Sequence, residues 1–166
     1  MQKKSWVKMG DQTSIIKIFR EEWADPDIAL PAYESTGAAG ADIRANFSAE
    51  KRKDGLILAP MGRGILPSGL RMEIPHGLEV QIRARSGLAA KHGIGIVNGP
   101  GTIDSDYRGP IGIMLINWGA DPIIITHGMR IAQLVVAPVI QAQFQLVSGL
   151  AETQRGSGGF GSTGTN

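Results

Sequence analysis

The chain has 166 residues, of which 42% are hydrophobic and 19% are charged, and these values are ordinary for a single globular domain. It contains no cysteine, which excludes disulfides and thiolate zinc sites, and a reducing cytoplasm is the expected location. The net charge of +2 does not indicate a nucleic-acid surface, and the sequence has neither an apolar run of the ~20 residues that span a membrane nor a signal peptide.

Short strand signals follow one another along the chain. They are rich in branched residues, are bounded by Gly, Pro, Asn or Asp, and cover residues 14–19, 56–60, 78–84, 111–117, 122–126, 130–136 and 141–147. Strict alternation of apolar and polar residues is clearest in 78–84 and 141–147, as in half-buried strands. The helix that the sequence predicts covers residues 86–93, where Ser86 can cap the start and Gly93 the end. Many short strands with 23 glycines and 9 prolines predict an all-β fold, a jelly-roll-like sandwich or barrel with one short helix.

The two ends of the chain differ from its middle, because residues 1–13 and 150–166 lack apolar periodicity. We therefore expect a disordered N-terminal extension over 1–13, one domain over residues 14–149, and a flexible C-terminal arm over 150–166. No internal repeat or interdomain linker divides the middle of the chain.

Generic nucleotide and metal motifs are absent or lack their structural context. GSGGFG at 156–161 matches a dinucleotide-binding pattern, but the helix and acidic residue that must follow it have no room in the sequence. No Gly-Lys-Ser/Thr follows a glycine run, so a P-loop is excluded. His76, His92 and His127 are far apart and are interpreted as loop residues rather than metal ligands. A Ser-His-Asp triad is weakly supported, since no G-x-S-x-G elbow occurs between a strand and a helix.

The central part of the chain carries the clearest chemical groups. At Arg85, Ser86 and Gly87 a strand runs into a helix start, where exposed amides, a hydroxyl and a cation suit an anionic oxygen such as a phosphate. The alternative is simply a capped short helix. A tight turn then leads a strand into Asp104, and this carboxylate is either part of a solvated edge or a group that orients and deprotonates a water.

With these segments in view, the chain resembles the trimeric deoxyuridine triphosphatases (dUTP diphosphatases). The five matching segments, in the order and spacing of that family, are AGADI (39–43), RSGLAAKHG (85–93), NGPGTIDSDYRG (98–109), GMRIAQLV (128–135) and RGSGGFGSTG (155–164). Ala84 stands where the family often has Pro, Met129 where Asp is usual, and Ile43 where Leu is common. None of these departures removes a group with an assigned chemical role, and Met129 affects only a local turn or a solvent contact.

The resemblance implies a jelly-roll subunit and a homotrimer with active sites where subunits meet. It also implies hydrolysis of dUTP to dUMP and pyrophosphate, which limits uracil incorporation into DNA and supplies dUMP for thymidylate synthesis. Asp104 would be the catalytic residue that activates a water for in-line attack on the α-phosphorus. Asp106, two residues on, is interpreted as structural or exposed.

Substrate-binding roles follow from the same resemblance. A hairpin from Asn98 to Tyr107 would recognise uracil through the Asn98 amide and the backbone of Gly101, Thr102 and Ile103. The ring of Tyr107 would pack on the deoxyribose and crowd out a 2′-hydroxyl, although an ordinary core aromatic residue is the alternative. The residues expected to hold phosphate oxygens or their water shell are Arg85, Ser86, Gly87 and Gln133. Mg²⁺ would be bound mainly by the phosphates, and Asp42 would contact it through a water.

The C-terminal arm would act as a lid that only bound substrate orders. Its glycines, among them Gly161, would let backbone amides approach the phosphates, and Arg155, Ser162 and Thr163 would donate to the γ-phosphate. Phe160 would stack over the uracil. In the family the arm reaches the site of a neighbouring subunit, whereas a functionless disordered tail is the alternative.

Two other functions are compatible with parts of the sequence. A deoxycytidine triphosphate deaminase shares the fold and assembly but uses a glutamate base in the central motif, and no glutamate lies near Asp104 in the sequence. A non-catalytic deoxynucleotide sensor is the second alternative, and the presence of both Asp104 and the C-terminal arm argues against it.

Overall fold

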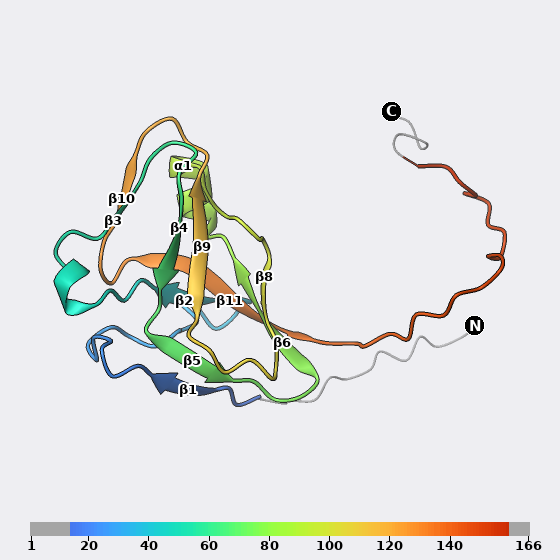
Figure 1. Cartoon of the computed structure of the whole chain (residues 1–166), viewed down its shortest axis with the longest axis horizontal. Coiled ribbons are helices and arrows are strands. Elements are labelled where there is room, and N and C mark those ends of the chain that lie inside the picture. Colours follow the sequence, from blue (N-terminus) through green and yellow to red (C-terminus); the bar gives the residue numbers. More distant parts are fainter. Residues whose placement is uncertain (1–13, 160–166) are drawn as a thin grey trace.

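The computed structural model describes residues 14–159, and within this range short antiparallel strands dominate (Figure 1). The strands are β1 Lys17–Arg20, β2 Ala41–Arg44, β3 Leu56–Leu58, β4 Arg63–Pro67, β5 Leu70–Glu73, β6 Leu78–Arg83, β7 Ile94–Ile96, β8 Gly101–Ile103, β9 Gly112–Asn117, β10 Ile123–Ile125 and β11 Arg130–Pro138. The helix α1 covers Ser86–His92, and a single 3-10 turn covers Ala49–Lys51. None of the helical segments within the described range is long and apolar enough to cross a membrane.

Two antiparallel sheets make up most of the domain. One has the strand order β2-β11-β6-β8 and the other has the order β4-β9-β7, and the pairs β1-β5 and β10-β3 form two smaller two-stranded sheets. Neighbours within a sheet are mostly far apart in sequence, so the chain crosses repeatedly between the sheets, as in a jelly roll. The expected all-β fold with one short helix is confirmed.

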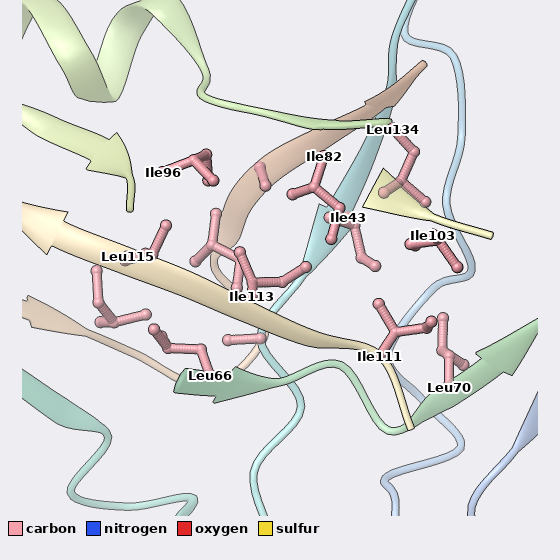
Figure 2. Packing of buried hydrophobic residues seen from close by; sticks show 14 of the residues in the cluster. Ile43, Leu66, Leu70, Ile82, Ile96, Ile103, Ile111, Ile113, Leu115 and Leu134 are labelled. Carbon is pink, nitrogen blue, oxygen red and sulfur yellow. The ribbon is translucent and has the colours of Figure 1, made fainter. Parts of the chain in front are cut away.

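The core lies between the inner faces of the two large sheets (Figure 2). In β9 the residues alternate strictly between half-buried and buried, so Ile113 and Leu115 point inward at 0% exposure. From the opposite sheet Ile43 and Ile82 point toward them, and branched side chains fill this layer because they suit a pleated, half-buried surface.

One polar side chain in the core is fully satisfied. Asn117, at the end of β9, is 0% exposed. Its Nδ2 donates to the Leu58 carbonyl at 2.9 Å and to the Asp121 carbonyl at 2.8 Å, and its Oδ1 accepts from the Gly119 N–H at 2.9 Å. Asn117 thus ties β9 to β3 and to the turn before β10.

The boundaries of several elements lie close to those expected from sequence. The strands over 56–60, 78–84, 111–117, 122–126 and 130–136 appear as β3, β6, β9, β10 and β11, and the strand expected over 14–19 starts three residues later as β1. Gly93 ends α1 in the left-handed conformation, with φ of +67°. The expected cap at Ser86 is wrong, because Arg85 is the N-cap residue and makes no side-chain capping bond, while Ser86 is the first helical residue.

The strand expected over 141–147 does not form within this chain. After β11 the backbone runs away from both sheets (Figure 1), and every residue of 140–150 is exposed. The side chains of Phe144 and Leu146 are each 99% exposed. A strand needs a neighbour for its N–H and C=O groups, and the path of the chain here offers none.

Candidate active site

A cluster of charged side chains lies where β6 ends and α1 begins. Arg85 donates from Nε to Asp42 Oδ1 at 3.1 Å and from Nη1 to the Arg130 carbonyl at 3.1 Å. The Arg130 guanidinium donates to the other carboxylate oxygen, Asp42 Oδ2, at 3.1 Å and lies 3.1 Å from Glu34 Oε2. Asp42 is only 14% exposed in its side chain, and its carboxylate bridges two guanidinium groups. We call Glu34, Asp42, Arg85 and Arg130 the bridged cluster.

A bulge in β11 explains how Arg130 reaches this cluster. The register between β11 and β2 shifts between Arg130 and Ala132, and the two consecutive residues Ile131 and Ala132 are both buried. Arg130 and Gln133 consequently share the half-buried outer face, three residues apart instead of two. Without the shift, alternation would place these two side chains on opposite faces of the sheet.

Gln133 supports the backbone that carries Arg85. It pairs in register with Asp42 on one side and with Arg83 on the other. Its Nε2 donates to the Ala84 carbonyl at 2.8 Å, immediately before Arg85. Ser86 and Gly87 follow in the first turn of α1, and both are exposed. The structure therefore brings together five residues expected from sequence, namely Asp42, Arg85, Ser86, Gly87 and Gln133.

Arg130 and Glu34 were missed at the sequence level. Arg130 lies inside the matching segment GMRIAQLV, which is the one signal that could have identified it. Glu34 lies outside the matching segments, and its proximity depends on how the loop before β2 folds against β11. Neither contact could be read from the spacing along the chain.

The residues expected to bind uracil form a second group along β8. A cavity of about 160 Å³ is lined by Asn98, Gly101, Thr102, Ile103, Asp104 and Tyr107, with Ile82, Pro110, Ile111, Gly112 and Met114 completing the wall. Asp104 is exposed at its mouth and also borders a larger hollow of about 520 Å³ that contains Glu79 and Asp106. The expected hairpin from Asn98 to Tyr107 is not a two-stranded unit, because β8 pairs with β6 and is followed by a turn in which the Tyr107 N–H donates to the Asp104 carbonyl at 3.2 Å.

The two groups lie at opposite ends of β6 in the same chain. The register pairs Val80 with Ile103 and Ile82 with Gly101. Asp104 follows Ile103 and therefore lies beside Glu79, near the start of β6. Arg85 lies six residues beyond Glu79 in the other direction, which corresponds to roughly 20 Å along the strand. One copy of the chain thus holds Asp104 and the bridged cluster apart.

Asp42 is the described residue expected to contact a metal ion through a water. No group of three or more acidic or histidine side chains within residues 14–159 could hold a metal ion by itself. Both oxygens of Asp42 accept from guanidinium groups, and each still has a free lone pair that a metal-bound water could donate to. These residues fit a metal held mainly by substrate phosphates.

A third charged group surrounds Asp25. Its Oδ1 accepts from the Asp27 N–H at 3.0 Å, and its Oδ2 lies 3.1 Å from His127 Nε2 and 3.1 Å from Arg52 Nη1. The Asp27 N–H, the His127 hydrogen bond and the Arg52 charge lower the pKa of Asp25. Because His127 Nδ1 accepts from the Phe47 N–H at 3.0 Å, the neutral ring carries its proton on Nε2.

Two of the three histidines lie in loops, as the sequence indicated. His127 lies in a loop before β11, and His76 lies in the loop before β6, as expected. His92 is the last residue of α1 instead of a loop residue.

The C-terminal arm is described as far as residue 159. Arg155 Nε donates to the Gly158 carbonyl at 3.0 Å, within a local turn. Residues 150–157 are exposed. Phe160, Gly161, Ser162 and Thr163 lie outside the described residues.

Comparison with known proteins identifies relatives over nearly the whole chain. The family model for dUTPase matches residues 27–164. A deoxyuridine 5′-triphosphate nucleotidohydrolase of Roseobacter denitrificans is 61% identical over 150 residues, which are 90% of this chain and 95% of that protein. The enzyme of the same name from Dinoroseobacter shibae is 57% identical, covering 90% of this chain and 97% of its own length. The solved structure of the Staphylococcus bacteriophage 80alpha dUTPase with dUPNHPP has the same fold, with a TM-score of 0.77 at 23% identity over 92% of this chain and 99% of that one.

Proposed function

The chain belongs to the dUTPase family and is a dUTP-hydrolysing enzyme, and we propose that each active site combines Asp104 of one copy with the bridged cluster of another. The observation that carries this proposal is the separation of roughly 20 Å along β6 between the two groups. A general base must lie within hydrogen-bond reach of the water that it activates, and that water must lie beside the bound phosphate. Within one copy, the two groups are too far apart to serve the same phosphate.

Asp104 would orient a water and accept its proton. The water oxygen forms a bond to the α-phosphorus while the bond from that phosphorus to the oxygen leading to the β-phosphorus breaks. The products are dUMP and pyrophosphate, and the proton that Asp104 accepted is released to solvent. The exposed position of Asp104 at the mouth of the cavity leaves room for this water.

The cavity along β8 would bind the deoxyuridine. The Asn98 amide has both a donor and an acceptor, and the backbone of Gly101 to Ile103 can complete the polar edge of uracil. A backbone wall leaves no room for the methyl group of thymine, and cytosine would place a donor against a donor. Tyr107 would lie against the deoxyribose.

Arg85, Ser86, Gly87 and Gln133 would bind the phosphates. Mg²⁺ bound to phosphate oxygens and waters would neutralise negative charge as the bond breaks. Asp42 would contact its water shell while holding Arg85 and Arg130 in place.

We propose an assembly of three copies, the number that the resemblance to the trimeric dUTP diphosphatases implies, closed as a ring in which every Asp104 meets the bridged cluster of another copy. The exposed, alternating segment 141–147 supports this arrangement, since its unpaired backbone can add to the sheet of another copy. Sedimentation should give a particle of about three chains. The cytoplasm, where nucleotides are made, is the proposed location.

The arm from residue 150 onward would close over the bound substrate. Its described residues 150–157 are exposed, so deleting the chain from Arg155 should leave the melting temperature without nucleotide unchanged. The same deletion should lower kcat/KM for dUTP by about 10²-fold or more, because it removes a cation, several donors and an aromatic ring. Equal activity of the truncated and full-length chains would contradict the lid.

Pyrophosphate release from dUTP, dCTP, dTTP and UTP tests the function directly. We expect release from dUTP and little from the other three. Ammonia released from dCTP would instead identify a deaminase. Tight binding of dUTP without release would identify a sensor.

A further inference from the structure

The aromatic ring of Tyr107 lies directly on the bare Cα of Gly109. A Cβ added to Gly109 would fall 2.6 Å from Cζ and 2.9 Å from Cε2 of that ring, and closer still to its hydroxyl oxygen. Real Cβ atoms essentially never approach other heavy atoms within 3.0 Å. Any side chain at position 109 therefore excludes the ring from its present place.

One hydrogen bond holds the tip of the ring, and a second holds the backbone that carries it. Its hydroxyl donates to the Pro110 carbonyl at 3.1 Å, and its own backbone N–H donates to the Asp104 carbonyl at 3.2 Å. The side chain is nevertheless 45% exposed and lines the cavity along β8. A ring that is tethered at its tip and exposed elsewhere can swing outward once its resting place is filled.

We propose that Gly109 is a specificity-determining residue that acts through Tyr107. Its missing side chain lets the ring lie low enough over the sugar site to exclude a 2′-hydroxyl, while the Pro110 carbonyl fixes the tip of the ring. The assignment deepens the proposed function and rests on it, because the readout requires dUTP as substrate. Sequence spacing gives no hint of this contact, since residues i and i+2 meet here only through the turn that follows β8.

The backbone at Gly109 tolerates a side chain, which makes the substitution informative. Gly109 is not among the described glycines with positive φ, so Gly109→Ala introduces no backbone strain. The three atoms nearest to the added methyl group all belong to the Tyr107 side chain. We therefore expect Gly109→Ala to displace the exposed Tyr107 ring and to leave the rest of the fold unchanged.

The test compares the ratio of kcat/KM for dUTP to that for UTP in five proteins: the unaltered chain, Gly109→Ala, Gly37→Ala, Tyr107→Ala and the double variant. We expect Gly109→Ala to lower this ratio about tenfold, because steric discrimination of a single small group is of this size. Gly37→Ala is the matched control, since a Cβ there meets nothing within 4 Å and the residue has no positive φ. Gly37→Ala should leave the ratio unchanged.

Comparing Tyr107→Ala with the double variant Tyr107→Ala/Gly109→Ala distinguishes a role of Gly109 through the ring from a purely structural role. If Gly109 acts only through the ring, adding Gly109→Ala to Tyr107→Ala should change the ratio no further. The double variant has no ring to displace, so it remains measurable even if Gly109→Ala alone unfolds. An unchanged dUTP to UTP ratio in folded Gly109→Ala, or a further fall in the double variant, would overturn the assignment. Absence of dUTP hydrolysis by the unaltered chain would instead refute the proposed function.

Discussion

Two inactive variants of this chain should restore activity when they share an assembly. Arg85→Gln removes the phosphate-binding guanidinium, and Asp104→Asn removes the proton acceptor while keeping its size. Asp104→Asn should lose about 10²-fold or more in kcat, because a general base contributes at least that much, and Arg85→Gln should lose a similar factor because a charged donor to the phosphates is removed. Both substitutions should leave the fold intact, since Asp104 is exposed and Asp42 keeps its contact with Arg130 when Arg85 is replaced.

The size of the recovery follows from the strand register. Because β6 separates Asp104 from Arg85 by roughly 20 Å, one functional site takes the two groups from different chains. In a random mixture of equal amounts, each of the two contributing chains is intact at its position half of the time. About a quarter of the sites then carry both groups, so we expect about a quarter of the unaltered activity.

The assay is pyrophosphate release from dUTP after the two variants are unfolded together and refolded. The matched control mixes Asp104→Asn with Asn98→Ala, two positions on the same cavity of one chain. That mixture should show only the mean of its two components. Native mass spectrometry should find assemblies that contain both variants. If it does and the refolded mixture of Arg85→Gln and Asp104→Asn is no more active than the separate variants, the shared site is refuted.

Three other substitutions test the surroundings of the site and the core. Arg130→Met should raise KM for dUTP about 5-fold with a smaller change in kcat, because Asp42 loses one of its two partly exposed guanidinium partners; steady-state kinetics measures the split. Asn117→Ala should destabilise the fold by about 2–4 kcal/mol, since it leaves the buried Leu58 carbonyl and two partly buried backbone groups without their partner; chemical denaturation measures the loss. Asp25→Asn should lower stability above the ordinary carboxyl pKa of 3.8, and this difference should vanish as the pH falls through the lowered pKa of Asp25 in the folded state. A difference that persists at the lowest pH would mean that the Asp25 carboxylate charge is not what His127 stabilises.

The sequence predicts elements well where one face of a strand is buried by the same chain. Alternation in 78–84 and 111–117 is preserved in β6 and β9, whose inward side chains form the core. The same alternation in 141–147 predicts a strand that a single chain does not form. Periodicity indicates which face of a segment is apolar and suited to burial. It does not indicate whether the sheet that covers this face belongs to the same copy of the chain.

The candidate site was likewise predicted from the sequence only in part. The matching segments identify the residue types that the chemistry needs, and the structure gathers five of them, Arg85 included, where β6 ends and α1 begins. Arg130 was missed because its orientation depends on a bulge in β11 that shifts the register by one residue. The separation of Asp104 from Arg85 was also inaccessible, since it requires knowing that β8 pairs with β6 in the register that joins Val80 to Ile103.

The charges of the bridged cluster explain why its residues alone do not suffice for a triphosphate. Two carboxylates, Glu34 and Asp42, pair with two guanidinium groups, Arg85 and Arg130, so the four side chains carry no net charge. A triphosphate brings several negative charges that must be neutralised when water is excluded. The positive charge must then come from groups that arrive with the substrate or close over it, which is the role proposed for Mg²⁺ and for Arg155 of the arm. Asp42 also explains how the chain holds two arginines close together, because its carboxylate lies between them and accepts from both.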